Sequence, residues 1–95
     1  MELTFSGAIW YWRGPSPHHF VTVPDDEAAA IASVSAAITY GWGCIPVRGS
    51  VGCTEFTTSL FPQDGGYIVP LKVAVRRAEG LDVGDDVTVR LVLDV

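Results

Sequence analysis

The last segment of the chain alternates apolar and polar side chains so regularly that it constrains the fold more than any other feature. Alternate positions on one side are all apolar: Val87, Val89, Leu91 and Leu93. The positions between them are mainly polar: Thr88, Arg90, Val92 and Asp94. Successive side chains of a β-strand point to opposite faces, so this period of two predicts a strand with one face in a core.

Five more segments carry strand signals and are separated by turn residues. The opening run ELTFSGAIWYWRG (residues 2–14) turns one apolar set to one face: Leu3, Phe5, Ile9 and Tyr11. Gly7 inside that run predicts a bend or a bulge. The other expected strands cover residues 18–23, 44–51, 54–61 and 67–70. Turns are expected at residues 14–17, near Gly52, and at Asp64-Gly65-Gly66.

A helix is expected between the second and third strand segments. It begins after Pro24 with Asp25-Asp26-Glu27, because acidic residues favour the N-terminus of a helix. Its core-facing stripe has helical spacing: Ile31, Val34, Ser35 and Ile38. Gly41 is expected to cap its C-terminal end.

A second helix is expected from Leu71 to Gly80, where the glycine ends it. Its apolar stripe has helical spacing: Leu71, Ala74, Val75, Ala78 and Leu81. The charged residues fall on the solvent side: Lys72, Arg76 and Glu79, with Arg77 at the edge. As a strand, the same segment would mix Arg77 with valines on one face, so the helix is preferred.

The order of the expected elements is ββαβββαβ, which predicts a mainly β fold. Six short strands around one small core indicate a six-stranded closed or split β-barrel with two short α-helices. With 95 residues the chain has room for one hydrophobic core. We therefore interpret residues 1–95 as a single small β-barrel domain.

Composition excludes several classes of protein. Apolar residues make up 48% of the chain and charged residues 18%, which excludes an intrinsically disordered protein. The net charge of −5 argues against a general binder of nucleic acids or anionic membranes, although it leaves room for a local basic patch. No apolar run approaches the roughly 20 residues of a membrane span.

The cysteines and the N-terminus indicate a cytoplasmic protein. The opening MELTFSG has an acidic residue where a signal peptide carries basic ones. Cys44 and Cys53 are therefore expected to be free thiols, most simply partly buried small apolar residues.

Four motifs together resemble one known family. They are VTVP before the first helix, GWGCIPVRGSVG, TSLFPQDGGYIVPLKVAVRRAEGL and VGDDVTVRLVL. This pattern is similar to the bacterial domain-of-unknown-function family DUF1905 over nearly the whole chain. The resemblance implies a small β-barrel, which occurs alone or ahead of a bacteriocin-protection domain of the YdeI/OmpD-associated type. It implies no activity.

The resemblance also implies which residues form the family signature. The matching positions are Ser59, Pro62, Gly66, Lys72, Arg76, Gly84 and Asp85. Gly84-Asp85 further resembles the GD-box turn of cradle-loop barrels. Physically, Gly84 can adopt a positive φ and the Asp85 carboxylate can accept backbone N–H groups, so a structural role is expected.

The sequence gives no reason to expect a catalytic residue, a metal or a cofactor. His18 and His19 are adjacent in a strand, point to opposite faces and cannot easily share an ion, so solvated or capping histidines are expected. Ser59 lacks the G-x-S-x-G context of a nucleophile elbow and is interpreted as a structural hydroxyl.

Three tryptophans form a candidate aromatic interaction surface. Trp10 and Trp12 are two residues apart and share the outward face of the first strand. Either a helix covers them as a second core layer, or they form an exposed patch for a partner or ligand. Trp42 lies in a glycine-flanked loop, where it closes the barrel or extends outward.

Three basic residues form a candidate anion-binding site: Arg48, Lys72 and Arg76. A guanidinium group can bind a carboxylate or phosphate with two hydrogen bonds. The alternative is a solvated helix face in which Glu79 neutralises part of Arg76.

From these features we expect a non-enzymatic β-barrel that acts as a binding or interaction module. The alternative is a small-ligand-binding protein or enzyme whose aromatic-lined pocket contains Arg76. Its partner would be an unidentified protein or small molecule, a homodimer is compatible with the sequence, and neither nucleic acid nor membrane is expected as a partner.

Overall fold

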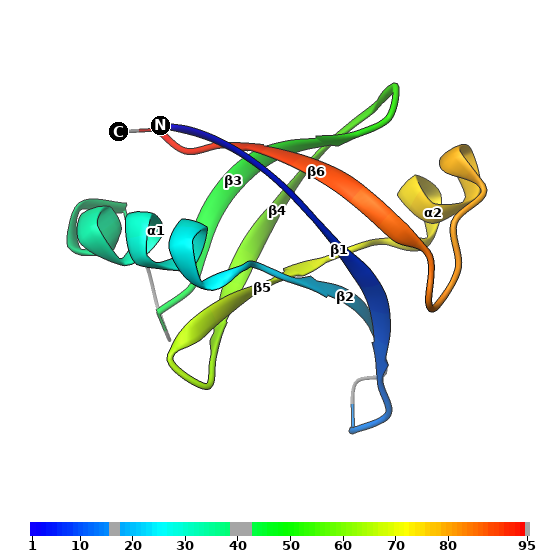
Figure 1. Ribbon diagram of the computed structural model, residues 1–95, viewed down its shortest axis with the longest axis horizontal. Helices are drawn as coiled ribbons and strands as arrows, with labels where there is room; N and C mark the ends of the chain where they lie inside the picture. Colours follow the sequence, from blue (N-terminus) through cyan, green and yellow to red (C-terminus); the bar gives the residue numbers. More distant parts are fainter. Residues whose placement is uncertain (16–17, 39–42, 95) are drawn as a thin grey trace.

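Six antiparallel strands close into a barrel in the computed structural model, which describes residues 1–15, 18–38 and 43–94 (Figure 1). The strands are β1 (Glu2–Trp12), β2 (His18–Thr22), β3 (Ile45–Val51), β4 (Thr54–Gln63), β5 (Gly66–Pro70) and β6 (Asp86–Val92). The helices are α1 (Asp25–Ile38) and α2 (Val73–Glu79). Around the barrel the strands follow the order β1-β2-β5-β4-β3-β6, and β6 pairs again with β1. The predicted fold class and element order are confirmed, and the barrel is closed.

The two longest strands, β1 and β4, each pair with two neighbours. The first part of β1 pairs with β6, and its last part, from Ile9 to Trp12, pairs with β2. Similarly, β4 pairs first with β3 and then, from Phe61 onward, with β5. Both strands therefore extend from one side of the barrel to the next, and the curvature of β1 is visible in Figure 1.

Gly7 lies in an unbroken stretch of this pairing. It is opposite Val87, and the register continues regularly on both sides, so no bulge interrupts β1 at this residue. A Cβ at this position would lie 3.1 Å from Cγ1 of Val21. The glycine therefore allows β2 to approach β1 closely.

The β4–β5 hairpin closes through the turn that the sequence predicts. Asp64 and Gly65 both have positive φ, 50° and 80°. A two-residue turn with positive φ at both positions has the twist that antiparallel strands require.

The barrel interior is filled by one face of each strand. The fully buried side chains are Ile9, Ile31, Ile45, Leu60, Leu71, Leu91, Leu93, Val21, Val69 and Val89. Ile31 belongs to α1, which lies at the opposite side of the barrel from α2 (Figure 1). The side-chain stripe predicted for α1 is supported by Ile31, whereas the expected cap at Gly41 lies outside the described residues.

The buried face of α2 differs from the prediction. Lys72 has extended backbone (φ −67°, ψ 155°), so the helix starts after it and has only seven residues. Val75 is buried, but Ala74 and Ala78 are exposed. A short helix contacts the barrel through about one turn, so Leu71 before it and Val75 within it provide the anchor. Gly80 ends the helix, as predicted, and has a left-handed backbone conformation (φ 64°).

Both cysteines are free thiols: Cys44 is buried and Cys53, in the β3–β4 turn, is exposed. Within the described residues, neither helix is long and apolar enough to cross a membrane.

Candidate functional site

The outer face of strands β2, β5 and β4 carries apolar side chains where solvated polar ones would be expected. Side chains that point into the barrel, such as Val21 and Val69, are fully buried. Their neighbours along the strands therefore point outward. Cross-strand pairing places Phe20 opposite Pro70 and Phe61 opposite Ile68 on this outer face.

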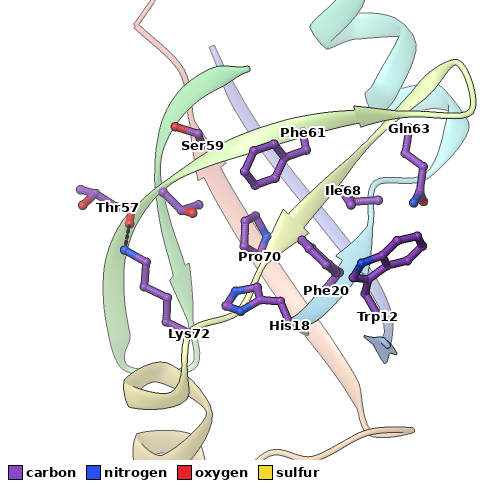
Figure 2. A pocket seen from close by; sticks show the side chains of 11 residues that line it. Trp12, His18, Phe20, Thr57, Ser59, Phe61, Gln63, Ile68, Pro70 and Lys72 are labelled. Carbon is purple, nitrogen blue, oxygen red and sulfur yellow. Dashed lines mark hydrogen bonds between the residues drawn. The ribbon is translucent and has the colours of Figure 1, made fainter. Parts of the chain in front are cut away.

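These residues form an open groove of about 860 Å³ (Figure 2). Its lining residues are Trp12, His18, Phe20, Thr57, Thr58, Ser59, Phe61, Gln63, Ile68, Pro70 and Lys72. From Thr57 to Gln63 the groove follows six residue steps of β4, a length of about 20 Å. Its volume lies in the range of about 300–1,000 Å³ that is typical of small-molecule sites.

Phe20 forms the floor of the groove and packs against two neighbouring rings. Its ring centroid lies 5.2 Å from that of Trp10 and 5.3 Å from that of His18, the latter in an edge-on arrangement. Only 8% of Phe20 is exposed. The indole Nε1 of Trp10 donates a hydrogen bond of 2.9 Å to Oγ1 of Thr22, which fixes the first ring of the row.

Trp12 and Phe61 are the exposed rings of the groove. Their exposed fractions are 45% and 42%. The Trp12 ring lies across Gly14, where a Cβ atom would overlap the indole. The prediction that Trp10 and Trp12 share the outer face is confirmed. Trp10 is half-buried against Phe20 and Trp12 is exposed, while Trp42 lies outside the described residues.

Polar groups line the groove along β4 and at the start of α2. Nζ of Lys72 donates to the backbone carbonyl of Thr57 at 3.5 Å, a long contact (Figure 2). Ser59 and Gln63 follow at alternate positions along β4, on either side of Phe61. The groove therefore combines an apolar centre with polar groups at its margins.

The ionisable side chains near Lys72 influence one another. The pKa of His18 is lowered, mainly because the ring is partly buried and further because His19, Arg76 and Lys72 lie near it. Burial also lowers the pKa of His19, an effect that Arg76 strengthens and Asp82 opposes. Cationic groups thus gather around His18 at this end of the groove.

The three basic residues predicted to bind an anion lie in different surroundings. Lys72 lines the groove. Arg76 is half-buried behind it, and its Nε donates to the carbonyl of Leu71 at 3.4 Å. Arg48 lies on β3, where its guanidinium contacts Asp94 at 3.4 Å. Lys72 and Arg76 both contribute to lowering the pKa of His18. Arg48 instead lines a separate hollow on the outer face of β3, β4 and β6.

Glu79 has a different partner from the one that the helix pattern predicts. It accepts a hydrogen bond of 2.6 Å from Oγ1 of Thr54 and does not pair with Arg76. The ion pairs between side chains of the described residues are Arg48–Asp94 and Arg90–Glu2. The short helix turns Glu79 toward the β3–β4 hairpin, so it is not available to neutralise Arg76.

The groove residues do not form an obvious catalytic pair. Ser59 lies on β4 and His18 on β2, with β5 between them, so two strand spacings of about 10 Å separate their backbones. The two histidines do point to opposite faces, as predicted: His18 packs on Phe20 and His19 on Tyr11. Within the described residues, no group of three or more His, Cys, Asp or Glu side chains is placed to hold a metal ion.

Comparison with known families identifies the family to which the chain belongs. A family model described as "Domain of unknown function (DUF1905)" matches residues 5–91. The chain belongs to the DUF1905 family. No curated protein matches it.

The turn before β6 contains Gly84 and Asp85, two of the residues that the sequence resemblance predicts to belong to the family signature. Gly84 has a φ of 91°, and the Asp85 carboxylate accepts the backbone N–H of Asp82 at 2.9 Å. The N–H of Gly84 also donates to the carbonyl of Ile9, and the N–H of Ile9 donates to the carbonyl of Asp85. This turn therefore fastens the start of β6 to the middle of β1.

Three other residues that the resemblance predicts to belong to the signature lie in the β4–β5 hairpin. Pro62 pairs with Tyr67, Gly66 pairs with Gln63, and Ser59 lines the groove. The apolar floor, Phe20, Ile68, Phe61 and Pro70, is the part of the site that the sequence-based prediction missed. Its signal is that β2 and β5 have consecutive apolar residues, as in Phe20-Val21 and Ile68-Val69, which is typical of strands with two covered faces.

Proposed function

We propose that this DUF1905 domain is a non-enzymatic binding module that holds a small molecule in the groove on the outer face of β2, β5 and β4. The observation that carries the proposal is the convergence of two exposed rings, Trp12 and Phe61, on one apolar groove. Exposed aromatic surface gathered at one place on a small protein is typical of a binding site.

The groove is organised before any ligand arrives. Phe20 packs against the rings of Trp10 and His18, and Trp10 is fixed by its hydrogen bond to Thr22. A site whose side chains are already ordered loses little conformational entropy on binding, so more of the contact energy appears as affinity. The hydroxyl, amide and ammonium groups at its margins supply the polar contacts that orient a ligand.

The non-enzymatic part of the proposal rests on the separation of the reactive groups. A serine nucleophile needs a base within hydrogen-bonding distance, about 2.6–3.2 Å. Ser59 and His18 lie on strands that are not neighbours. Arg76, expected as the charged residue of an aromatic pocket, lies outside the groove lining, where Lys72 takes its place.

Three further parts of the proposal rest on the sequence. We place the domain in the cytoplasm because both cysteines are free thiols. The net charge of −5 supports a partner other than nucleic acid. A homodimer would leave the groove open or cover it, and sedimentation with and without a bound probe would distinguish the two.

The first prediction tests the groove with an uncharged apolar probe, N-phenyl-1-naphthylamine, whose fluorescence rises when it leaves water. Phe61→Ala should weaken its binding about tenfold, because a ring contact of about 1.4 kcal/mol is lost. Phe61 is 42% exposed in the free protein, so its removal should change stability little.

The matched control is Tyr11→Ala, which removes a ring of similar exposure, 40%, outside the groove lining. Probe affinity should stay within twofold of wild type in this variant. Equal losses in both variants, or no saturable binding to the wild type, would contradict the proposed function.

A further inference from the structure

The charges of the chain are distributed unevenly around the groove. The sequence has 11 acidic and 6 basic residues. Among the described residues that line the groove, however, the ionisable ones are His18 and Lys72, and none is acidic. An acidic protein that presents only potential cations along one groove has there a local field that attracts anions.

Lys72 has hydrogen-bonding capacity to offer a ligand. Its ammonium has three donors, and the contact to the Thr57 carbonyl is long, 3.5 Å. The side chain is exposed and extends from the segment between β5 and α2 (Figure 2). A small movement of this flexible side chain would let it contact an anion in the groove.

His18 lies at the same end and can provide a second donor. In Figure 2 its imidazole lies between Lys72 and the aromatic residues of the groove. The pKa of His18 is lowered by burial and by His19, Arg76 and Lys72, so the unliganded protein holds its neutral form. An anion beside it would offset that repulsion and favour the imidazolium.

We infer that the ligand is a small amphipathic anion, with its carboxylate or phosphate between His18 and Lys72 and its apolar body along the groove toward Phe61 and Trp12. This inference rests on the proposed function of the groove. The apolar part follows from the rings and from Ile68 and Pro70, and the anionic part follows from the two basic side chains at one end. The length of about 20 Å suits an extended alkyl chain or several fused rings.

The second prediction compares ligands that share one alkyl chain and differ in head group: decanoate, decyl phosphate, decanol and decylammonium, each below its micelle concentration. Chemical shift changes of backbone amides would report both affinity and position. Each anion should bind about fivefold tighter than decanol, as expected for one exposed charge interaction. Decylammonium should bind more weakly than decanol.

Lys72→Glu should reverse this order, so that decylammonium binds tighter than decanoate. Its matched control is Arg77→Glu, the same charge change at an exposed position of α2 outside the groove lining, which should keep the wild-type order. Arg77→Glu reversing the order as fully as Lys72→Glu would overturn the inference, since the effect would then be one of net charge.

The same measurements distinguish failure of this inference from failure of the proposed function. If decanol and both anions bind equally well and Phe61→Ala weakens all of them, the groove binds apolar ligands but the anionic head group is wrong. If none of the four binds, or if Phe61→Ala has no effect on those that do, the proposed function itself is wrong.

Discussion

At the scale of single residues, the position of Trp12 depends on a glycine two residues away. A Cβ at Gly14 would overlap the Trp12 indole, whereas φ of Gly14 lies outside the range that disfavours other residues. The absence of a side chain at residue 14 thus gives the ring its place at the end of the groove. The sequence shows both residues but not this contact, because it depends on the ring orientation in the folded chain.

The third prediction is that Gly14→Ala displaces the Trp12 ring without unfolding the protein. Affinity for N-phenyl-1-naphthylamine should fall about threefold to tenfold, because a mispositioned ring loses part of its contact. Tryptophan emission should also change. The free energy of unfolding should change by less than about 1 kcal/mol, since 45% of Trp12 is already exposed to solvent.

Gly66→Ala is the matched control, because it adds the same methyl group at another glycine. A Cβ at Gly66 would meet only ordinary contacts, the nearest at 3.7 Å. Probe affinity should be unchanged in this variant. A Gly14→Ala protein that binds the probe like the wild type would show that the observed position of Trp12 is not required.

At the scale of secondary-structure elements, the junction between β5 and α2 connects the groove to the core. Leu71 is fully buried, its N–H donates to the carbonyl of His19 at 2.9 Å, and its carbonyl accepts from Arg76. Lys72 follows directly and lines the groove. A buried residue thus positions the adjacent charged residue of the site.

The fourth prediction compares Leu71→Ala with Val73→Ala in urea unfolding. Leu71→Ala should destabilise the protein by about 2–5 kcal/mol, because it removes a buried side chain and leaves a cavity. Val73 is 47% exposed, so Val73→Ala should stay within about 0.5 kcal/mol of wild type. Similar losses in the two variants would mean that α2 packs through a different face.

Most elements could be predicted from the sequence because their signals are local. Alternation in Val87–Leu93, the Asp64-Gly65 turn and the glycine at the end of α2 each specify a backbone conformation within a few residues. The buried face of α2 could not be predicted in the same way. A helix of seven residues offers several faces, and the barrel wall decides which of them is covered.

The same limit applies to the candidate site. Arg48, Lys72 and Arg76 are spread over β3, the β5–α2 junction and α2, and their separation depends on cross-strand register. The sequence correctly predicts that Lys72 lies on the surface. It does not predict that Phe61 and Pro70 line the same groove, because it predicts the strands but not how they pair. The groove appears once pairing brings β2, β5 and β4 side by side.

At the scale of the whole molecule, closing the barrel decides which surface remains for a ligand. Inward faces of all six strands fill one core, and α1 and α2 lie at opposite sides (Figure 1). An apolar outer face then remains on β2, β5 and β4. The Phe61 and Trp12 side chains at the groove are 42% and 45% exposed in the free protein, so burying them under a ligand is favourable at about 25 cal/mol per Å² of apolar surface.

The protonation state of the groove also links ligand binding to the stability of the whole fold. His18 and His19 both have pKa values lowered from 6.5 in the folded protein. The unfolded chain therefore binds more protons as the pH falls below about 6.5, and the free energy of unfolding decreases. The pKa of Glu2 is lowered from 4.5 by Arg90, so its effect belongs to a lower pH range.

The fifth prediction is that an anionic ligand opposes this loss of stability. Decanesulfonate keeps its charge throughout, so its own titration does not interfere. Bound beside His18 and Lys72, it should favour the imidazolium of His18, and its stabilising effect on the melting temperature should grow as the pH falls from about 7.5 to 5.5. In His18→Gln the stabilisation by decanesulfonate should be nearly independent of pH. His19→Gln, which changes the opposite face of β2, should keep the pH dependence, although its range shifts because His19 no longer lowers the pKa of His18. His18, whose pKa is lowered mainly by burial, lies beside the proposed position of the head group, so its titration supplies the pH dependence. A stabilisation by decanesulfonate that is equally independent of pH in the wild type and in His18→Gln would place the head group elsewhere.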